Sequence, residues 1–178
     1  MTLALCGYVN VYDKVIFHDG VWQKIMPGCF AKSLTGRISL LLNHQPELLV
    51  GTNRDGCLEL YSDDIGLAMR AILPNTKHGK TARWMGNNGH TAASICFDHG
   101  AKTETRRIDG KNVVCFHEAR LTEVSYLFCK LGAFKETFLT YRDCDFTKSL
   151  REESKTFAYD GAAIGVTRAL ENLMNATS

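Results

Sequence analysis

The sequence lacks any apolar run that approaches the roughly 20 residues a membrane-spanning helix needs. The stretch MTLALCGYVNVYDK does not have the pattern of a signal peptide. It lacks a basic start, and Gly7 and Asn10 interrupt its short apolar run. We therefore expect a soluble protein of the cytoplasm with no membrane partner.

An excess of charge of one sign is also missing, since 21 Lys and Arg residues stand against 19 Asp and Glu residues, a net charge of +2. The only notable basic run is KTETRR, residues 102–107, and it contains no aromatic residue. A barrel that binds single-stranded nucleic acid combines basic and aromatic side chains on one face. The sequence therefore predicts no nucleic-acid partner.

The seven cysteines include no C-x-x-C pair, and their number is odd. This usage predicts reduced, largely buried thiols in a reducing compartment. Cys115 and His117 are the only close Cys/His pair, and on a strand both would lie on one face. Because a zinc site needs a larger cluster of ligands, we expect no metal and no cofactor.

The 178 residues suit one domain with a small appendage, and most of the first 130 form short apolar runs between turn signals. We expect strands at 3–9, 37–44, 65–73 and 91–98, a hairpin at 48–61 turning at Asp55 and Gly56, and one bent or two separate strands at 112–128. Such a pattern is typical of a mainly β (α+β) fold: a closed or nearly closed antiparallel β-barrel surrounded by a few helices.

Helices are expected at 28–36 and at 75–87, the latter with Asn75 or Thr76 as its cap. Two more helices are expected at 132–142 and 162–174, where apolar residues recur at helical spacing. The charged stretch 145–161 between them predicts a boundary: a barrel domain at 1–144, and a linker with a carboxy-terminal helix at 145–178. That stretch is either a solvated linker or a tether that undergoes self-processing.

His44 ends the run RISLLLNH, just before Pro46. On a strand it would continue the apolar face of Leu40 and Leu42, at the point where the proline stops the ladder. It is either a turn residue that donates to a nearby carbonyl or a base held at the rim of the sheet.

Ser94 shares one face of the run TAASICFD with Ala92 and Cys96. Its hydroxyl either bonds a backbone carbonyl or acts as a nucleophile, which requires an adjacent base. Cys96 lies two residues along the same face and is the alternative nucleophile.

Glu123 shares one face of a strongly apolar strand with Leu121, Ser125 and Leu127. It either faces solvent or needs a partner, and an imidazole is a natural one, because a carboxylate fixes its tautomer. Serine, histidine and an acid on strands of one fold permit a serine hydrolase, although only geometry can identify a triad.

Five segments, in order, carry a resemblance to a known family: PGCF (27–30), ISLLLNHQPELLVG (38–51), DDIGLAMRAIL (63–73), TAASICF (91–97) and ARLTEVSYL (119–127). The chain resembles the prohead proteases of tailed bacteriophages, whose fold is similar to herpesvirus assemblin, over roughly residues 5 to 140. It departs from the family pattern at Cys29, Ala93 and Cys96, and after Phe128 it lacks the expected proline and small residues.

The resemblance implies His44 as general base, Ser94 as nucleophile and Glu123 as the acid that orients His44. It implies a homodimer that cleaves scaffold or capsid-protein segments, and itself, inside the immature capsid in the bacterial host cytoplasm. Arg120 or backbone amides would be the oxyanion donors. The alternative is a non-catalytic barrel that scaffolds capsid assembly.

Overall fold

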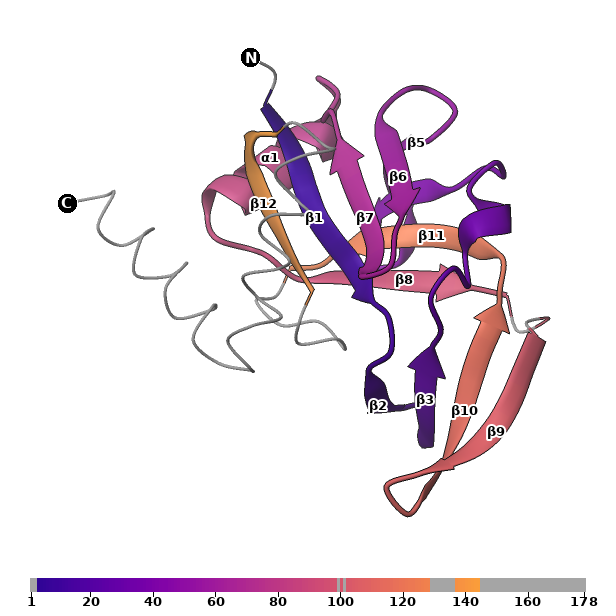
Figure 1. Ribbon diagram of the computed structural model, residues 1–178. Helices are drawn as coiled ribbons and strands as arrows, with labels where there is room; N and C mark the ends of the chain where they lie inside the picture. The colour runs from indigo at the N-terminus through magenta and orange to yellow at the C-terminus, as the bar shows by residue number, and fades with distance from the viewer. Residues whose placement is uncertain (1–2, 99, 101, 129–136, 145–178) are drawn as a thin grey trace. The chain divides into compact units, whose positions relative to one another are not determined.

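The strands of this chain form three four-stranded sheets in a computed structural model that describes residues 3–98, 100, 102–128 and 137–144 (Figure 1). The first sheet has the order β12-β1-β7-β6, with β12 at Phe138–Asp143, β1 at Leu3–Val11, β7 at Gly66–Ala71 and β6 at Leu58–Ser62. The second has the order β2-β3-β10-β9, with β2 at Val15–His18, β3 at Val21–Ile25, β10 at Lys111–Glu118 and β9 at Lys102–Ile108. The third, which we call the site sheet, has the order β5-β4-β11-β8, with β5 at Gln45–Thr52, β4 at Ser39–Leu42, β11 at Leu121–Tyr126 and β8 at Ala93–Phe97.

The core lies where the inner faces of these sheets meet. Leu5 and Val9 of β1, Leu40 and Leu42 of β4 and Val124 of β11 all belong to one buried apolar cluster. Residues two apart in a strand point to the same side, so this alternation leaves the opposite face of the site sheet free for polar side chains. The face of the site sheet turned away from the core carries the candidate site.

The mainly β, α+β class expected from the sequence is confirmed, but the closed antiparallel barrel is not. Among the described residues the strands pair as three separate sheets, and no pairing closes them into a ring. Two of the pairs, β3 with β10 and β4 with β11, are parallel. In each of these pairs the two strands are separated by more than 75 residues of sequence, long enough to form a crossover connection.

The helix expected at 75–87 is confirmed as α1, Lys77–Asn87. Thr76 is its N-terminal cap, and the Thr76 hydroxyl accepts a hydrogen bond from the backbone N–H of Gly79 at 3.1 Å. By contrast, the helix expected at 28–36 is only a single 3-10 turn at Ala31–Ser33. There the Ser33 hydroxyl bonds the Phe30 carbonyl, a local bond that competes with helix continuation.

The hairpin expected at 48–61 is wrong, because β5 and β6 belong to different sheets. The turn signal at Asp55 and Gly56 is real, and the Asp55 carboxylate accepts hydrogen bonds from the backbone N–H groups of Thr52 and Cys57. The turn therefore carries the chain from one sheet to the next. The segment 112–128 forms two strands, β10 and β11, that likewise belong to different sheets.

The helix expected at 132–142 is also wrong where the structure describes it, because Phe138–Asp143 is strand β12. This strand pairs with β1 from Leu3 opposite Asp143 to Tyr8 opposite Phe138, and it buries Leu139. The edge of β1 supplies backbone hydrogen bonds to this segment. These bonds stabilise the strand more than a weak helical spacing of apolar residues would stabilise a helix. Residues 132–136, the linker expected at 145–161 and the helix expected at 162–174 lie outside the described residues.

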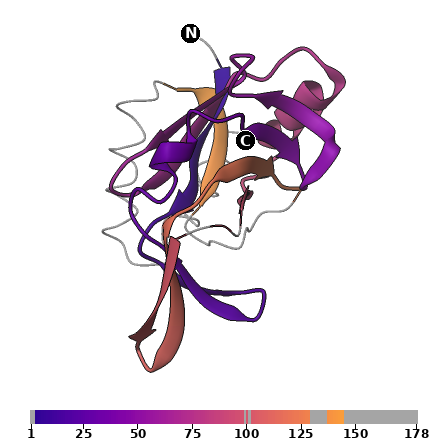
Figure 2. The same cartoon turned by 90° about the vertical axis from the view of Figure 1, so that its right-hand side faces the viewer.

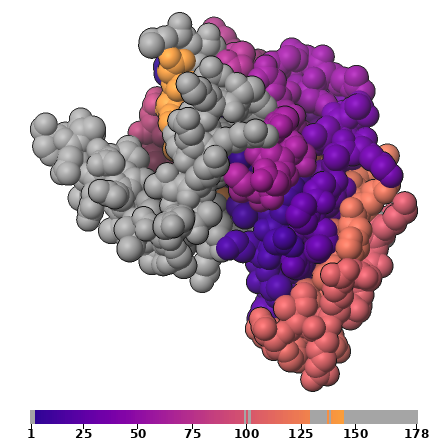
Figure 3. Space-filling model, in the orientation of Figure 1, coloured from indigo at the N-terminus to yellow at the C-terminus, as the bar shows by residue number. Residues whose placement is uncertain are grey.

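The second sheet extends away from the other two in both ribbon views (Figures 1 and 2). Every residue of β9 but Ile108 is exposed, and this strand forms an outer border of the space-filling view (Figure 3). Among the described residues, no helix has the length and apolar character needed to span a membrane.

Candidate active site

The loop between β4 and β5 is a two-residue turn made of Asn43 and His44. Leu42 pairs with Gln45 across it, and φ is 52° at Asn43 and 59° at His44. Positive φ at both central residues matches the tight hairpin turn whose twist suits adjacent strands. His44 therefore lies in the turn and does not extend the apolar face of β4. Pro46 does not end the ladder either, since it lies within β5.

Three hydrogen bonds fold this turn back over the end of β11. The backbone N–H of His44 donates to the Ser125 hydroxyl at 2.9 Å, and that of Asn43 donates to the Tyr126 carbonyl at 3.1 Å. The backbone N–H of Phe128 donates to the Asn43 side-chain oxygen at 2.8 Å. These bonds set the position of the His44 backbone relative to β11.

The imidazole of His44 meets the carboxylate of Glu123, with Nδ1 2.6 Å from Oε1. The largely buried Glu123 carboxylate is therefore paired with an imidazole. The Glu123 side chain is 15% exposed, and the His44 side chain is 43% exposed. An ionised carboxylate only accepts hydrogen bonds, so it selects the tautomer with the proton on Nδ1. The basic lone pair of the ring is then on Nε2, the nitrogen that a general base uses.

Ser94 lies on β8, the strand next to β11. In the antiparallel register Ser94 is opposite Ser125, and Cys96 is opposite Glu123. Opposite residues of an antiparallel pair carry their side chains on the same face, with Cβ atoms about 4.5–5.5 Å apart. Ser94 and Glu123 therefore share the outer face of the site sheet, although the hydrogen bonds described for this site join His44, Glu123 and Ser125, and Ser94 is not among them.

Ser125 is a residue of this site to which sequence reasoning assigned no role. Its side chain is fully buried, and its hydroxyl donates to Oε1 of Glu123 at 2.6 Å. The signal that could have found it is its spacing, since a serine two residues after a glutamate in one strand shares that glutamate's face.

Comparison with known proteins identifies the family. A family model described as caudovirus prohead serine protease matches residues 1–150. The chain belongs to this family. Membership makes it a serine protease of the kind that matures bacteriophage capsids. No curated protein matches the chain.

In this prohead protease, Cys96 differs from the chain's other described cysteines. It is exposed, whereas Cys6, Cys29, Cys57, Cys115 and Cys144 are buried, and all six are free thiols. Burial raises the pKa of Cys29 to about 12 and that of Cys57 to about 11, so neither forms a thiolate at neutral pH. The expectation of free and largely buried thiols is confirmed for these six, and Cys129 lies outside the described residues.

Arg120 lies at the far end of β8 from Ser94. Its Nε and one terminal nitrogen bind Oδ2 of Asp98 at 2.7 and 2.6 Å. Asp98 is four residues from Ser94, which at about 3.3 Å per residue in a strand is roughly 13 Å. This geometry does not favour Arg120 as a donor to an oxyanion at Ser94.

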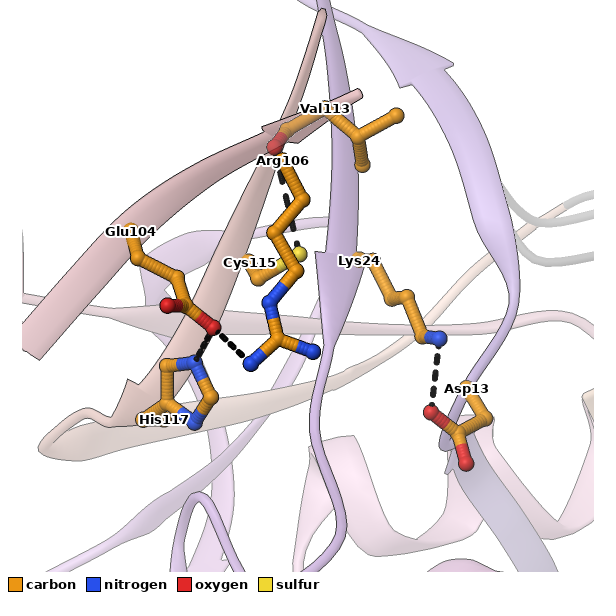
Figure 4. Close-up of polar contacts among 7 residues, drawn as sticks. All are labelled: Asp13, Lys24, Glu104, Arg106, Val113, Cys115 and His117. Carbon is orange, nitrogen blue, oxygen red and sulfur yellow. Dashed lines mark hydrogen bonds and ion pairs between the residues drawn. The ribbon is translucent and has the colours of Figure 1, made fainter. Parts of the chain in front are cut away.

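Cys115 and His117 lie on one face of β10, as expected, but they have separate partners (Figure 4). The Cys115 thiol donates to the Val113 carbonyl at 3.8 Å, and His117 Nε2 lies 2.7 Å from Oε1 of Glu104, which also pairs with Arg106. Within the described part of the chain, no group of three or more His, Cys, Asp or Glu side chains is arranged to hold a metal ion.

Proposed function

We propose that this chain is a serine endopeptidase of phage capsid maturation in which Ser94 is the nucleophile, His44 the general base and Glu123 the acid that orients His44. The observation that carries the proposal is the 2.6 Å contact between His44 Nδ1 and Glu123, on the face of the sheet that Ser94 shares. A base oriented by a third group next to a hydroxyl is the arrangement that activates a serine.

In the proposed reaction, the Ser94 oxygen attacks the scissile carbonyl carbon while His44 Nε2 takes the hydroxyl proton. The resulting imidazolium is stabilised by Glu123 and returns the proton to the leaving amine as the peptide C–N bond breaks. Water then attacks the acyl-enzyme ester with the same proton transfers in reverse order, which releases the new carboxylate and restores Ser94.

The substrates we infer are segments of the phage scaffolding or major capsid protein, and the protease itself within residues 145–178. Cleavage would take place inside the immature capsid, in the cytoplasm of the bacterial host. We further infer a homodimer and a barrel of the herpesvirus-protease kind, for which membership of the prohead protease family is the support.

A cysteine nucleophile is the second candidate, because Cys96 is exposed and lies opposite Glu123. Ser94 is favoured over it because Ser94 is nearer the end of β11 onto which the His44 turn folds. A non-catalytic scaffold would not require His44 and Glu123 to be in contact, and their hydrogen bond therefore supports the enzyme.

The test is covalent labelling with a fluorophosphonate at high protein concentration, read by intact mass and peptide mapping. We expect one adduct, on Ser94, which Ser94→Ala and His44→Ala both abolish. Two matched controls are expected to label normally. One is Thr105→Ala on the exposed strand β9, and the other is His78→Ala, whose ring contacts the Leu49 carbonyl. Folded, self-associated protein that gives no adduct would contradict the proposal, and an adduct on Cys96 would favour the cysteine candidate.

A further inference from the structure

Ser125 is a fully buried polar side chain on β11, whose other buried residues, Leu121, Val124 and Tyr126, belong to the core. A buried hydroxyl is costly unless it is hydrogen-bonded, and the commonest partner in a sheet is a nearby backbone carbonyl. Both hydrogen bonds described for Ser125 go instead to residues of the proposed triad, Glu123 and His44.

The direction of these bonds follows from the chemistry of the groups. The backbone N–H of His44 can only donate, so the Ser125 oxygen accepts there, at 2.9 Å. The single hydroxyl proton is then available for Oε1 of Glu123, at 2.6 Å. The same Oε1 meets His44 Nδ1 at 2.6 Å, so one carboxylate oxygen joins the imidazole and the buried hydroxyl.

We propose that Ser125 is a positioning residue of the active site, which holds the Glu123 carboxylate and the His44 backbone in the arrangement where Oε1 meets Nδ1. This inference rests on the proposed function of His44 and Glu123. Ser125 acts on both partners of one hydrogen bond, because it binds the side chain of one and the main chain of the other.

Ser125 is not itself the nucleophile. Its oxygen is fully buried, its proton is directed at Glu123, and it contacts the main chain of His44, not the imidazole. Ser94, opposite it on β8, is partly exposed. The two serines therefore have different roles: one faces the substrate and the other supports the base.

The test measures the rate constant of fluorophosphonate labelling at Ser94, as a function of pH, in Ser125→Ala, Ser125→Thr and the control Thr105→Ala on the exposed strand β9. Ser125→Ala loses a hydrogen bond to a charged group, so it should be labelled about 10- to 100-fold more slowly than the wild type. Ser125→Thr keeps the hydroxyl and is expected within about threefold of the wild type, since β-branched residues suit strands. Thr105→Ala should label as the wild type does.

A double-mutant cycle with Glu123→Gln separates positioning from general support of the fold. If Ser125 acts through Glu123, Ser125→Ala should slow labelling much less in the Glu123→Gln background than in the wild type. Equal slowing in both backgrounds would overturn the proposal. A folded Ser125→Ala protein that labels at the wild-type rate would overturn it too, as would a folded Ser125→Thr protein that labels at least 10-fold slower than the wild type.

NMR observation of the His44 Nδ1–H proton tests the inference without any activity. That proton lies in the 2.6 Å contact with Oε1 of Glu123, so Ser125→Ala should move its resonance or make it exchange faster with water. An unchanged resonance and exchange rate would overturn the positioning role. If the wild type shows no labelling but Ser125→Ala changes this proton signal, the proposed function fails while the role of Ser125 stands.

Discussion

Nδ1 of His44 lies 2.6 Å from Oε1 of Glu123, although 79 residues of sequence separate them. The contact exists because β4 and β11 are parallel neighbours, and the turn after β4 folds back over β11. The carboxylate thereby fixes which ring nitrogen is basic. The importance of this contact for catalysis can be tested by a substitution that removes the charge of Glu123 and keeps the shape of its side chain.

Glu123→Gln is expected to slow labelling of Ser94 by about 10³- to 10⁴-fold, because a neutral amide no longer stabilises the imidazolium or selects its tautomer. The rate constant of fluorophosphonate labelling measures this, with circular dichroism to verify the fold. Glu59→Gln on β6, which removes an exposed pair with Arg70, is the control and should label normally. A folded Glu123→Gln protein with the wild-type rate would rule out the orienting role.

Cys96→Ala should leave labelling and peptide hydrolysis within about twofold of the wild type, because Ser94 supplies the nucleophile and removal of an exposed side chain changes stability little. Ser94→Ala in the same assay should lose activity. Hydrolysis that survives Ser94→Ala and disappears in Cys96→Ala would reverse the assignment of the nucleophile.

Gly86→Ala should lower the free energy of unfolding by about 1 kcal/mol or more, even though alanine favours helices over glycine. The reason is space: a Cβ at Gly86 would lie 2.6 Å from Cβ of Tyr141, where α1 passes β12 (Figure 1). Urea unfolding measures the change. Asn87→Ala, at the exposed neighbouring position of α1, should be neutral or slightly stabilising, and equal effects of the two substitutions would contradict the close approach.

Protonation of Asp55 should make the fold less stable at acid pH. Partial desolvation opposes ionisation of its carboxyl, but hydrogen bonds from the backbone N–H groups of Cys57 and Thr52 outweigh this and hold its pKa below the ordinary value. A lowered pKa means that the ionised form stabilises the fold above the ordinary pKa of about 3.9 and that this contribution is lost as the pH falls through the folded pKa.

Asp55→Asn should therefore destabilise the fold in urea unfolding at pH 7 and less at pH 3, where the wild type is losing the same charge. Because the carboxylate is exposed and screened by water, we expect a cost at pH 7 of about 0.5 kcal/mol. The exposed Asp64→Asn serves as the control and should cost little at either pH. A cost for Asp55→Asn that stays constant from pH 7 to pH 3 would argue against a charged Asp55 in the turn.

Local chemistry in the sequence was enough to predict several elements. Thr76, one of the two caps that the pattern allowed, caps α1. The short alternating runs predicted the mainly β class and many of the strands, although β2, β3 and β9 were not predicted. Capping and period-2 alternation involve atoms a few residues apart, so a single segment contains all the information they need. The three candidate residues were likewise found by residue type, alternation and family resemblance.

Only the tertiary structure decided how the strands pair and what the site residues contact. The turn at Asp55 connects two sheets where the sequence predicted a hairpin, and Phe138 begins a strand where it predicted a helix. Any extended segment offers the same backbone donors and acceptors, so partners are chosen by distant parts of the chain. His44 adopts a left-handed turn, and Ser125 joins it to Glu123, because β4, β8 and β11 meet in one sheet.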